Sequence, residues 1–138
     1  MAAKGSAEWK GDLPSGTGTF TAGDSISGGY TFKSRFEDGP GSNPEQLIAA
    51  AHAACFSMAL ASGLSKAGHE PQELRTSATV SFQPGEGIKR IALTVDGSVP
   101  GLDEDGFRAA AETAKENCPV SKALAGVPEI GLEARLAS

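Results

Sequence analysis

The sequence predicts an α+β fold in which an antiparallel β-sheet wraps around one long central helix. Short Thr- and Gly-rich runs separated by turn-prone segments indicate a β-meander over about residues 1–34. An Ala- and Leu-rich run over about residues 44–67 indicates the helix. A hairpin and further helices are expected over about residues 73–138. With no linker or internal repeat, residues 1–138 are predicted to form a single domain.

The composition predicts an acidic globular protein. The chain has 138 residues, is 39% hydrophobic and carries a net charge of −5, so it can bury a core but offers no basic patch for nucleic acid or anionic lipid. Two cysteines are too few for a disulfide-stapled scaffold, and the N-terminal sequence lacks the apolar segment of a signal peptide. We therefore expect a cytoplasmic protein without nucleic-acid or membrane partners.

Each N-terminal element follows from local signals. The runs GTGTFTAG and GGYTFKSRF are interpreted as strands, and residues 35–43 as a loop. Asn43 can then cap the central helix, Pro44 suits its first position, and Glu45 complements the positive end of the helix dipole. Gly68 is predicted to end it.

The central helix is apolar on nearly every side. Too few of its residues are strongly apolar for a membrane span, and it contains His52 and two serines between residues 48 and 64. The better interpretation is a helix enclosed by the sheet and by a second copy of the chain.

The C-terminal half alternates strands and helices. Residues 74–83 and 88–99 alternate apolar and polar side chains around the turn PGEG, which predicts a long hairpin. A helix is expected over 103–117, a short helix over 119–124 and a closing strand over 130–136.

Two thiols are the obvious nucleophile candidates. Cys118 precedes Pro119 at a predicted helix start, where free N–H groups favour a thiolate. Cys55 lies roughly 15 Å along the central helix, beyond the reach of the helix dipole. Lowering its pKa by ~3 units corresponds to ~4 kcal/mol, which a nearby cation would have to supply. Either cysteine can instead be a small buried hydrophobe.

His52 leaves other functions open. It precedes Cys55 by one helical turn, so the two side chains could form a Cys/His nucleophile for acyl transfer, or His52 could simply be satisfied inside a dimer. A further alternative is a non-enzymatic dimer that binds a small ligand and only packs its cysteines. The spacing of Cys55, Cys118 and the two histidines matches no zinc motif, so no metal site is expected.

Two motifs resemble a known family. NPEQLIAAAHAACFSMAL and ENCPVSKAL look like the paired signatures of the osmotically inducible protein C (OsmC) and organic hydroperoxide resistance (Ohr) family. AEWKGD, SRF and the closing strand extend the resemblance over essentially the whole chain. HAACFSMAL together with CPVSKAL is similar to the OsmC branch.

The resemblance implies a thiol-dependent peroxidase that reduces organic hydroperoxides, and hydrogen peroxide more weakly, in oxidative and osmotic stress defence. It implies that Cys55 attacks the peroxide and Cys118 resolves the product to a disulfide, the reverse of what helix position suggests. Arg35 would stabilise the Cys55 thiolate, and Glu45 would hold the guanidinium by charge-assisted hydrogen bonds.

The resemblance also implies the partners. No metal, flavin or haem cofactor is required, and an external dithiol, for example of the lipoyl type, would reopen the disulfide. Family members are intertwined homodimers whose long helices lie at the centre, with the active sites at the subunit interface.

Overall fold

The computed structural model describes residues 1–137, which form two three-stranded sheets and four helices. The chain divides into two compact units, Met1–Leu47 and Ile48–Ser138. The division falls inside helix α2 (Pro44–Lys66), so no linker separates the units. The mixed α+β composition agrees with the predicted fold class, whereas the single domain stays a prediction.

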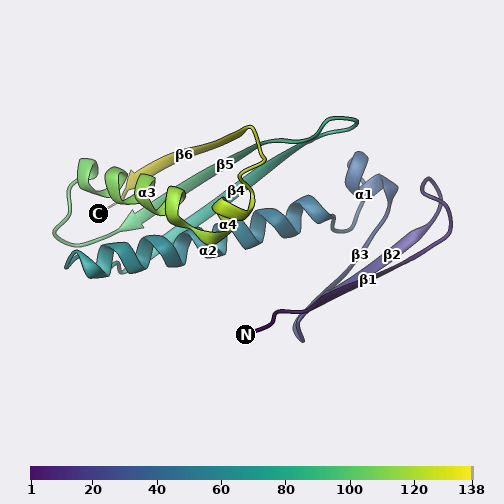
Figure 1. Cartoon of the computed structure of the whole chain (residues 1–138), viewed down its shortest axis with the longest axis horizontal. Coiled ribbons are helices and arrows are strands. Elements are labelled where there is room, and N and C mark those ends of the chain that lie inside the picture. The colour runs from purple at the N-terminus through teal and green to yellow at the C-terminus, as the bar shows by residue number, and fades with distance from the viewer. Residues whose placement is uncertain (138) are drawn as a thin grey trace. The chain divides into compact units, whose positions relative to one another are not determined.

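The sheet of the first unit is the predicted meander. Strands β1 (Gly5–Lys10), β2 (Thr17–Ala22) and β3 (Ile26–Tyr30) pair antiparallel in that order (Figure 1). The rings of Trp9 and Tyr30 pack at 5.4 Å over the central strand. Gly18 lies beneath them, because a Cβ atom there would come within 2.6 Å of either ring.

The predicted third strand GGYTFKSRF is wrong in its second half. Strand β3 ends at Tyr30, and helix α1 (Phe32–Phe36) follows it. Thr31 and Ser34 form a reciprocal capping box, in which the Thr31 hydroxyl accepts from the Ser34 N–H and the Ser34 hydroxyl accepts from the Thr31 N–H. This local hydrogen bonding starts a helix where the sequence pattern alone favoured a strand.

The start and end predicted for α2 are confirmed. The side-chain oxygen of Asn43 accepts from the N–H of Gln46 at 2.8 Å, and Pro44 is the first helical residue. After the helix, Gly68 has a φ of +88°, and the N–H of His69 donates to the Leu64 carbonyl at 2.9 Å. This is the glycine C-terminal cap that such a turn favours.

The sheet of the second unit has one parallel pairing. Strand β4 (Glu73–Gln83) pairs antiparallel with β5 (Gly87–Ser98), as the hairpin prediction required. Helices α3 (Glu104–Asn117) and α4 (Pro119–Ala123) then carry the chain back across the sheet. Strand β6 (Glu129–Leu136) therefore pairs parallel with β5, which departs from the expected antiparallel sheet.

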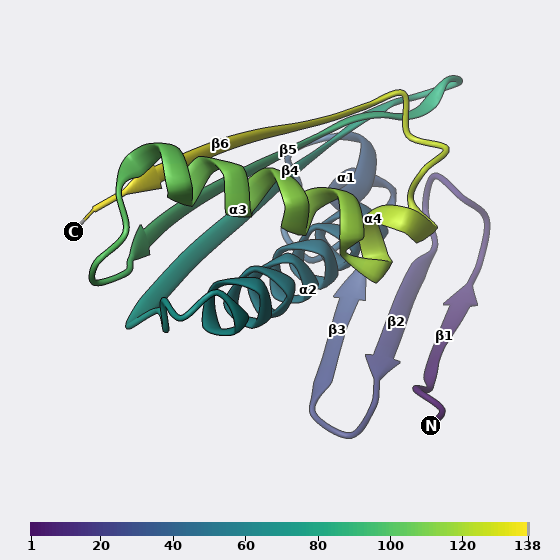
Figure 2. The same ribbon diagram turned by 60° about the vertical axis from the view of Figure 1, so that its left-hand side comes forward.

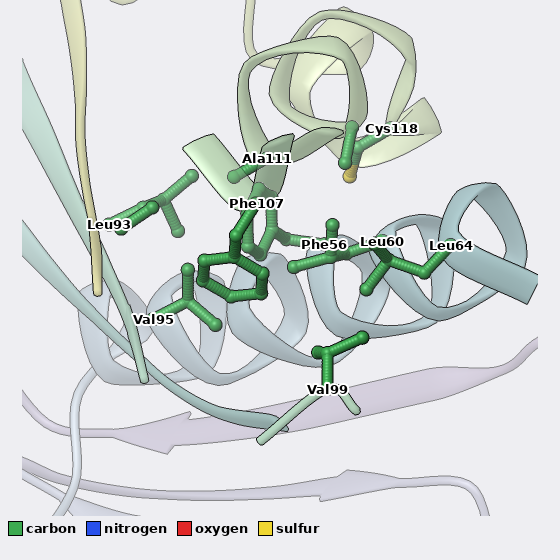
Figure 3. Close-up of a cluster of buried hydrophobic side chains, with 11 residues drawn as sticks. Phe56, Leu60, Leu64, Leu93, Val95, Val99, Phe107, Ala111 and Cys118 are labelled. Atoms are coloured by element: carbon green, nitrogen blue, oxygen red, sulfur yellow. The ribbon is translucent and has the colours of Figure 1, made fainter. Parts of the chain in front are cut away.

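Helices α2 and α3 pack on one face of this sheet (Figure 2). The close-up in Figure 3 shows the ring of Phe107 between the helices and the sheet. Gly97 allows this approach, because a Cβ atom on it would come 2.4 Å from the Phe107 ring. The fully buried side chains of this core include Phe56, Leu60, Val95, Phe107, Ala111 and Cys118.

A second face of α2 is apolar but uncovered. Ala51, Ala54 and Met58 are exposed, and Met58 retains 75% of its accessible surface. The helix is long and apolar enough to span a membrane, which is weak evidence because core helices of soluble proteins meet the same criterion. Only 22% of its most apolar window is buried inside the structure.

Candidate active site

Cys55 lies on α2 at the border between its buried and exposed faces. The next residue, Phe56, is completely buried, whereas the Cys55 side chain is partly exposed and packs against the edge of the core.

Cys118 lies at the junction of α3 and α4 and is fully buried. Its backbone is held on both sides, since its N–H donates to the Ala114 carbonyl at 2.8 Å and its carbonyl accepts from the Lys122 N–H at 3.0 Å. The predicted helix start at Pro119 is confirmed, and it fixes the position of the Cys118 side chain.

The fold brings the two thiols together. Both cysteines are free, and their sulfur atoms interact directly, with the thiol of Cys55 donating to Cys118. The two residues come from segments roughly sixty positions apart, so tertiary packing rather than a local motif creates the pair. A disulfide between them would join α2 to the α3–α4 junction.

The two thiols ionise unequally within this unit. Burial and the interaction with Cys118 raise the pKa of Cys55. Burial also opposes ionisation of Cys118, but hydrogen bonds from the backbone N–H of Ser121 and from Cys55 outweigh it, and the pKa of Cys118 is lowered. Within residues 48–137 the negative charge is thus favoured on Cys118, as its place before Pro119 predicted.

Arg35 and Glu45 form the expected ion pair, and both belong to the first unit. The guanidinium donates from Nε to Oε1 and from Nη2 to Oε2 of Glu45, each at 3.0 Å. Glu45 is 8% exposed, and the Phe36 ring lies 5.4 Å from the guanidinium carbon. Such bidentate geometry fixes the plane of the guanidinium and leaves Nη1 outside the pair with the carboxylate.

His52 pairs with a residue that the sequence analysis missed. The imidazole is fully buried, its Nε2 lies 2.7 Å from Oγ of Ser121, and its Nδ1 has no hydrogen-bond partner among residues 1–137. Burial lowers the pKa of His52, which favours the neutral ring. The Cys55–His52 pair that acyl transfer would need is therefore not formed. The one available signal for Ser121 was its place three residues after Cys118, on the same helical turn.

No metal centre stands out from the side-chain arrangement. Among residues 1–137, no group of three or more His, Cys, Asp or Glu side chains is arranged to hold a metal ion. The second unit thus offers two thiols and a buried Ser–His pair, and the first unit offers a guanidinium–carboxylate pair.

Solved structures share this fold. An OsmC-like protein from Mycoplasma pneumoniae superposes with a TM-score of 0.76 at 16% identity, covering 100% of this chain and 99% of that one. The organic hydroperoxide resistance protein OhrB of Bacillus subtilis gives a TM-score of 0.69 at 27% identity, covering 99% and 98%.

Sequence relatives place the chain in a family. Peroxiredoxin OsmC of Escherichia coli (strain K12) is 44% identical, covering 98% of this chain and 96% of the relative. An organic hydroperoxide resistance protein of Xanthomonas axonopodis pv. citri is 33% identical, covering 68% of this chain and 67% of the relative. The family described as OsmC-like protein matches residues 37–133, which include Glu45 and both cysteines. The chain therefore belongs to the OsmC-like family and shares more identity with its OsmC relative than with the Ohr relative, as its motifs predicted.

Proposed function

We propose that the chain is a thiol-dependent peroxidase that reduces organic hydroperoxides, and hydrogen peroxide more weakly, in oxidative and osmotic stress defence. The observation that carries the proposal is the direct interaction of Cys55 and Cys118, the two cysteines of the sequence. The names of the relatives, peroxiredoxin OsmC and organic hydroperoxide resistance protein, support the same chemistry.

The proposed cycle has two steps within the protein. The Cys55 thiolate attacks one peroxide oxygen, the O–O bond breaks, and the other oxygen takes up a proton and leaves as an alcohol or water. Cys55 is then a sulfenic acid. The Cys118 thiolate attacks its sulfur, the S–S bond forms, and the hydroxyl leaves with a proton as water.

The difference in exposure supports Cys55 as the cysteine of the first step. A bulky alkyl hydroperoxide must reach the attacking sulfur, and Cys55 is partly exposed whereas Cys118 is completely buried. In the second step, Cys118 needs to reach only the oxidised sulfur of Cys55, which lies beside it. Its lowered pKa suits this role, because a thiolate attacks the sulfenic sulfur readily.

Arg35 is proposed as the cation that Cys55 lacks in its own unit. A guanidinium next to the sulfur would offset the burial that raises the pKa of Cys55 and would orient the peroxide. Glu45 would hold the guanidinium through the two hydrogen bonds described above. The ion pair would thus present Arg35 in one fixed orientation during turnover.

The reductant is proposed to be an external dithiol, for example of the lipoyl type, acting on a cytoplasmic enzyme. The first thiol of the reductant would form a mixed disulfide with the enzyme. The second thiol would then attack that mixed disulfide and release both cysteines of the enzyme in reduced form. The proposed cycle uses no metal, flavin or haem, because sulfur itself carries the two electrons.

The first test is mass analysis of the reduced protein after one equivalent of cumene hydroperoxide. We expect the intact protein to lose two hydrogen atoms, and a proteolytic digest to contain a Cys55–Cys118 cross-link that dithiothreitol removes. Hydrogen peroxide should give the same product more slowly. Thiols that stay reduced for minutes with both oxidants would contradict the proposal and favour a ligand-binding protein.

The exposed face of α2 is proposed to bind a second copy of the chain. The patch is apolar and central, and the resemblance to intertwined family members implies the same arrangement. A homodimer would bury the two long helices against each other and place both active sites at the interface.

Ala54→Glu is expected to dissociate this dimer. Ala54 lies between Ala51 and Met58 on the exposed face, and burying a carboxylate there would cost several kcal/mol. Sedimentation equilibrium should give the mass of two chains for the wild type and of one chain for the variant. Ala109→Glu places the same charge on an exposed alanine of α3 and should stay dimeric. A dimeric Ala54→Glu protein would exclude this face as the interface.

A further inference from the structure

A buried polar pair adjoins the two thiols, and the proposed cycle does not use it. His52 is 0% exposed and Ser121 is 8% exposed, and their side chains meet at 2.7 Å. Polar groups are costly to bury, and apolar side chains would pack equally well at such a place. The position of this pair beside Cys118 suggests a role in the chemistry of that thiol.

The direction of the His52–Ser121 hydrogen bond follows from the unpaired ring nitrogen. A neutral imidazole carries one N–H, and burial keeps His52 neutral. A hydrogen on Nδ1 would be a buried donor without a partner among residues 1–137, whereas a hydrogen on Nε2 is satisfied by Ser121. His52 therefore donates from Nε2 to the hydroxyl oxygen of Ser121, and the hydroxyl hydrogen is left to point elsewhere.

The acceptor of that hydrogen is the sulfur of Cys118. Ser121 follows Cys118 by three residues, and the Lys122 N–H bond to the Cys118 carbonyl closes the turn that holds them together. Both the hydroxyl and the backbone N–H of Ser121 interact with the Cys118 sulfur. The hydrogen bonds thus run in one direction, from His52 through Ser121 to Cys118.

We infer that Ser121 and His52 are positioning residues for the resolving step, in which Ser121 holds the Cys118 thiolate toward Cys55 and His52 fixes the direction of the Ser121 hydroxyl. This inference rests on the proposed peroxidase function. During resolution the Cys118 sulfur bonds to the Cys55 sulfur, and the S–O bond of the sulfenic acid breaks. The leaving hydroxide takes a proton from solvent, which received one when Cys118 ionised, and departs as water.

The two steps can be timed separately in Ser121 variants. Trapping with dimedone follows the formation of the Cys55 sulfenic acid, and quenched mass analysis follows the disulfide. Ser121→Ala is expected to slow disulfide formation about tenfold, as the loss of one hydrogen bond to a charged sulfur predicts, and to change the peroxide step less than about twofold. Ser121→Thr keeps the hydroxyl and is expected to restore most of the resolving rate.

The role of His52 is tested with variants that keep or lose a hydrogen-bond donor to Ser121. His52→Gln can still donate to Ser121 and is expected to resolve faster than His52→Leu, which cannot. In a Cys55→Ser background, the ultraviolet absorbance of the Cys118 thiolate at neutral pH should fall in Ser121→Ala and in His52→Leu. Ser57→Ala is the control, because it removes a partly buried hydroxyl on α2 that bonds to Thr76. It should alter neither the thiolate absorbance nor the resolving rate.

The possible outcomes distinguish failure of the positioning role from failure of the proposed peroxidase function. A wild-type protein that forms no disulfide with hydroperoxide would refute the peroxidase and the positioning role with it. A wild type that cycles, with Ser121→Ala resolving at the same rate or Ser121→Thr resolving as slowly as Ser121→Ala, would refute the positioning role alone. Equal slowing of both steps would likewise overturn it, since a general loss of structure would then explain the defect.

Discussion

Cys55→Ser is expected to reduce cumene hydroperoxide consumption to the uncatalysed background. The proposed first step needs a thiolate, and a serine hydroxyl stays protonated at neutral pH and is a far weaker nucleophile toward a peroxide oxygen. The thiol that remains, Cys118, is completely buried and cannot meet a bulky hydroperoxide. Consumption of the hydroperoxide with dithiothreitol as reductant measures the effect.

Cys118→Ser is the matched control for this prediction. It removes the other thiol but leaves Cys55, so a single turnover should produce a sulfenic acid at residue 55 that dimedone traps. A Cys55→Ser protein with full activity would refute the assignment. A sulfenic acid trapped on Cys118 in the Cys55→Ser protein would show that the two cysteines have the opposite roles, in line with the lowered pKa of Cys118.

Arg35→Met is expected to slow the peroxide step by about a hundredfold or more at neutral pH. A cation close to a thiolate lowers its pKa by about one to three units, and without it burial leaves Cys55 mostly protonated. The rate of sulfenic acid formation under single-turnover conditions measures this loss. Glu45→Gln should have a smaller effect, because Arg35 keeps its charge and loses only one charged partner.

The pH dependence separates a charge effect from a damaged fold. If Arg35 acts as proposed, its loss would raise the pKa of Cys55, so the variant should recover activity as rising pH ionises the thiol. Its rate profile is expected to shift to higher pH than that of the wild type. Arg108→Met removes an exposed arginine paired with Glu104 on α3 and should leave the profile unchanged. A low Arg35→Met rate at every pH would contradict the electrostatic role.

Features set by neighbouring residues could be predicted from the sequence. The cap at Asn43, the proline at the start of α2 and the glycine after it all act within a few residues. The β4–β5 hairpin was equally accessible, because alternation and a Gly-containing turn specify it locally.

Features set by distant contacts were not accessible in this way. The parallel pairing of β6 depends on where α3 and α4 return the chain, and alternation within a strand carries no sign of its direction. Helix α1 was missed because its capping box uses Ser34 rather than the usual Glu or Gln.

The same distinction between local and distant contacts holds for the candidate site. Helix position correctly predicted that Cys118 would be the more acidic thiol within its unit, whereas the pairing of Cys55 with Cys118 came only from the resemblance to a family. The His52–Ser121 bond joins residues 69 positions apart, and a lone serine in a short helix gives no sign of such a partner.

The anchoring of Cys118 has a consequence for heat resistance. Its backbone is hydrogen-bonded on both sides, so oxidation would tie two fixed segments of the second unit and close a loop of roughly sixty residues. A cross-link of that span restricts the unfolded chain and stabilises the folded one by about 4 kcal/mol. During turnover the protein would thus alternate between a disulfide form of higher thermal stability and a dithiol form of lower thermal stability. A cell short of reductant would accumulate the disulfide form.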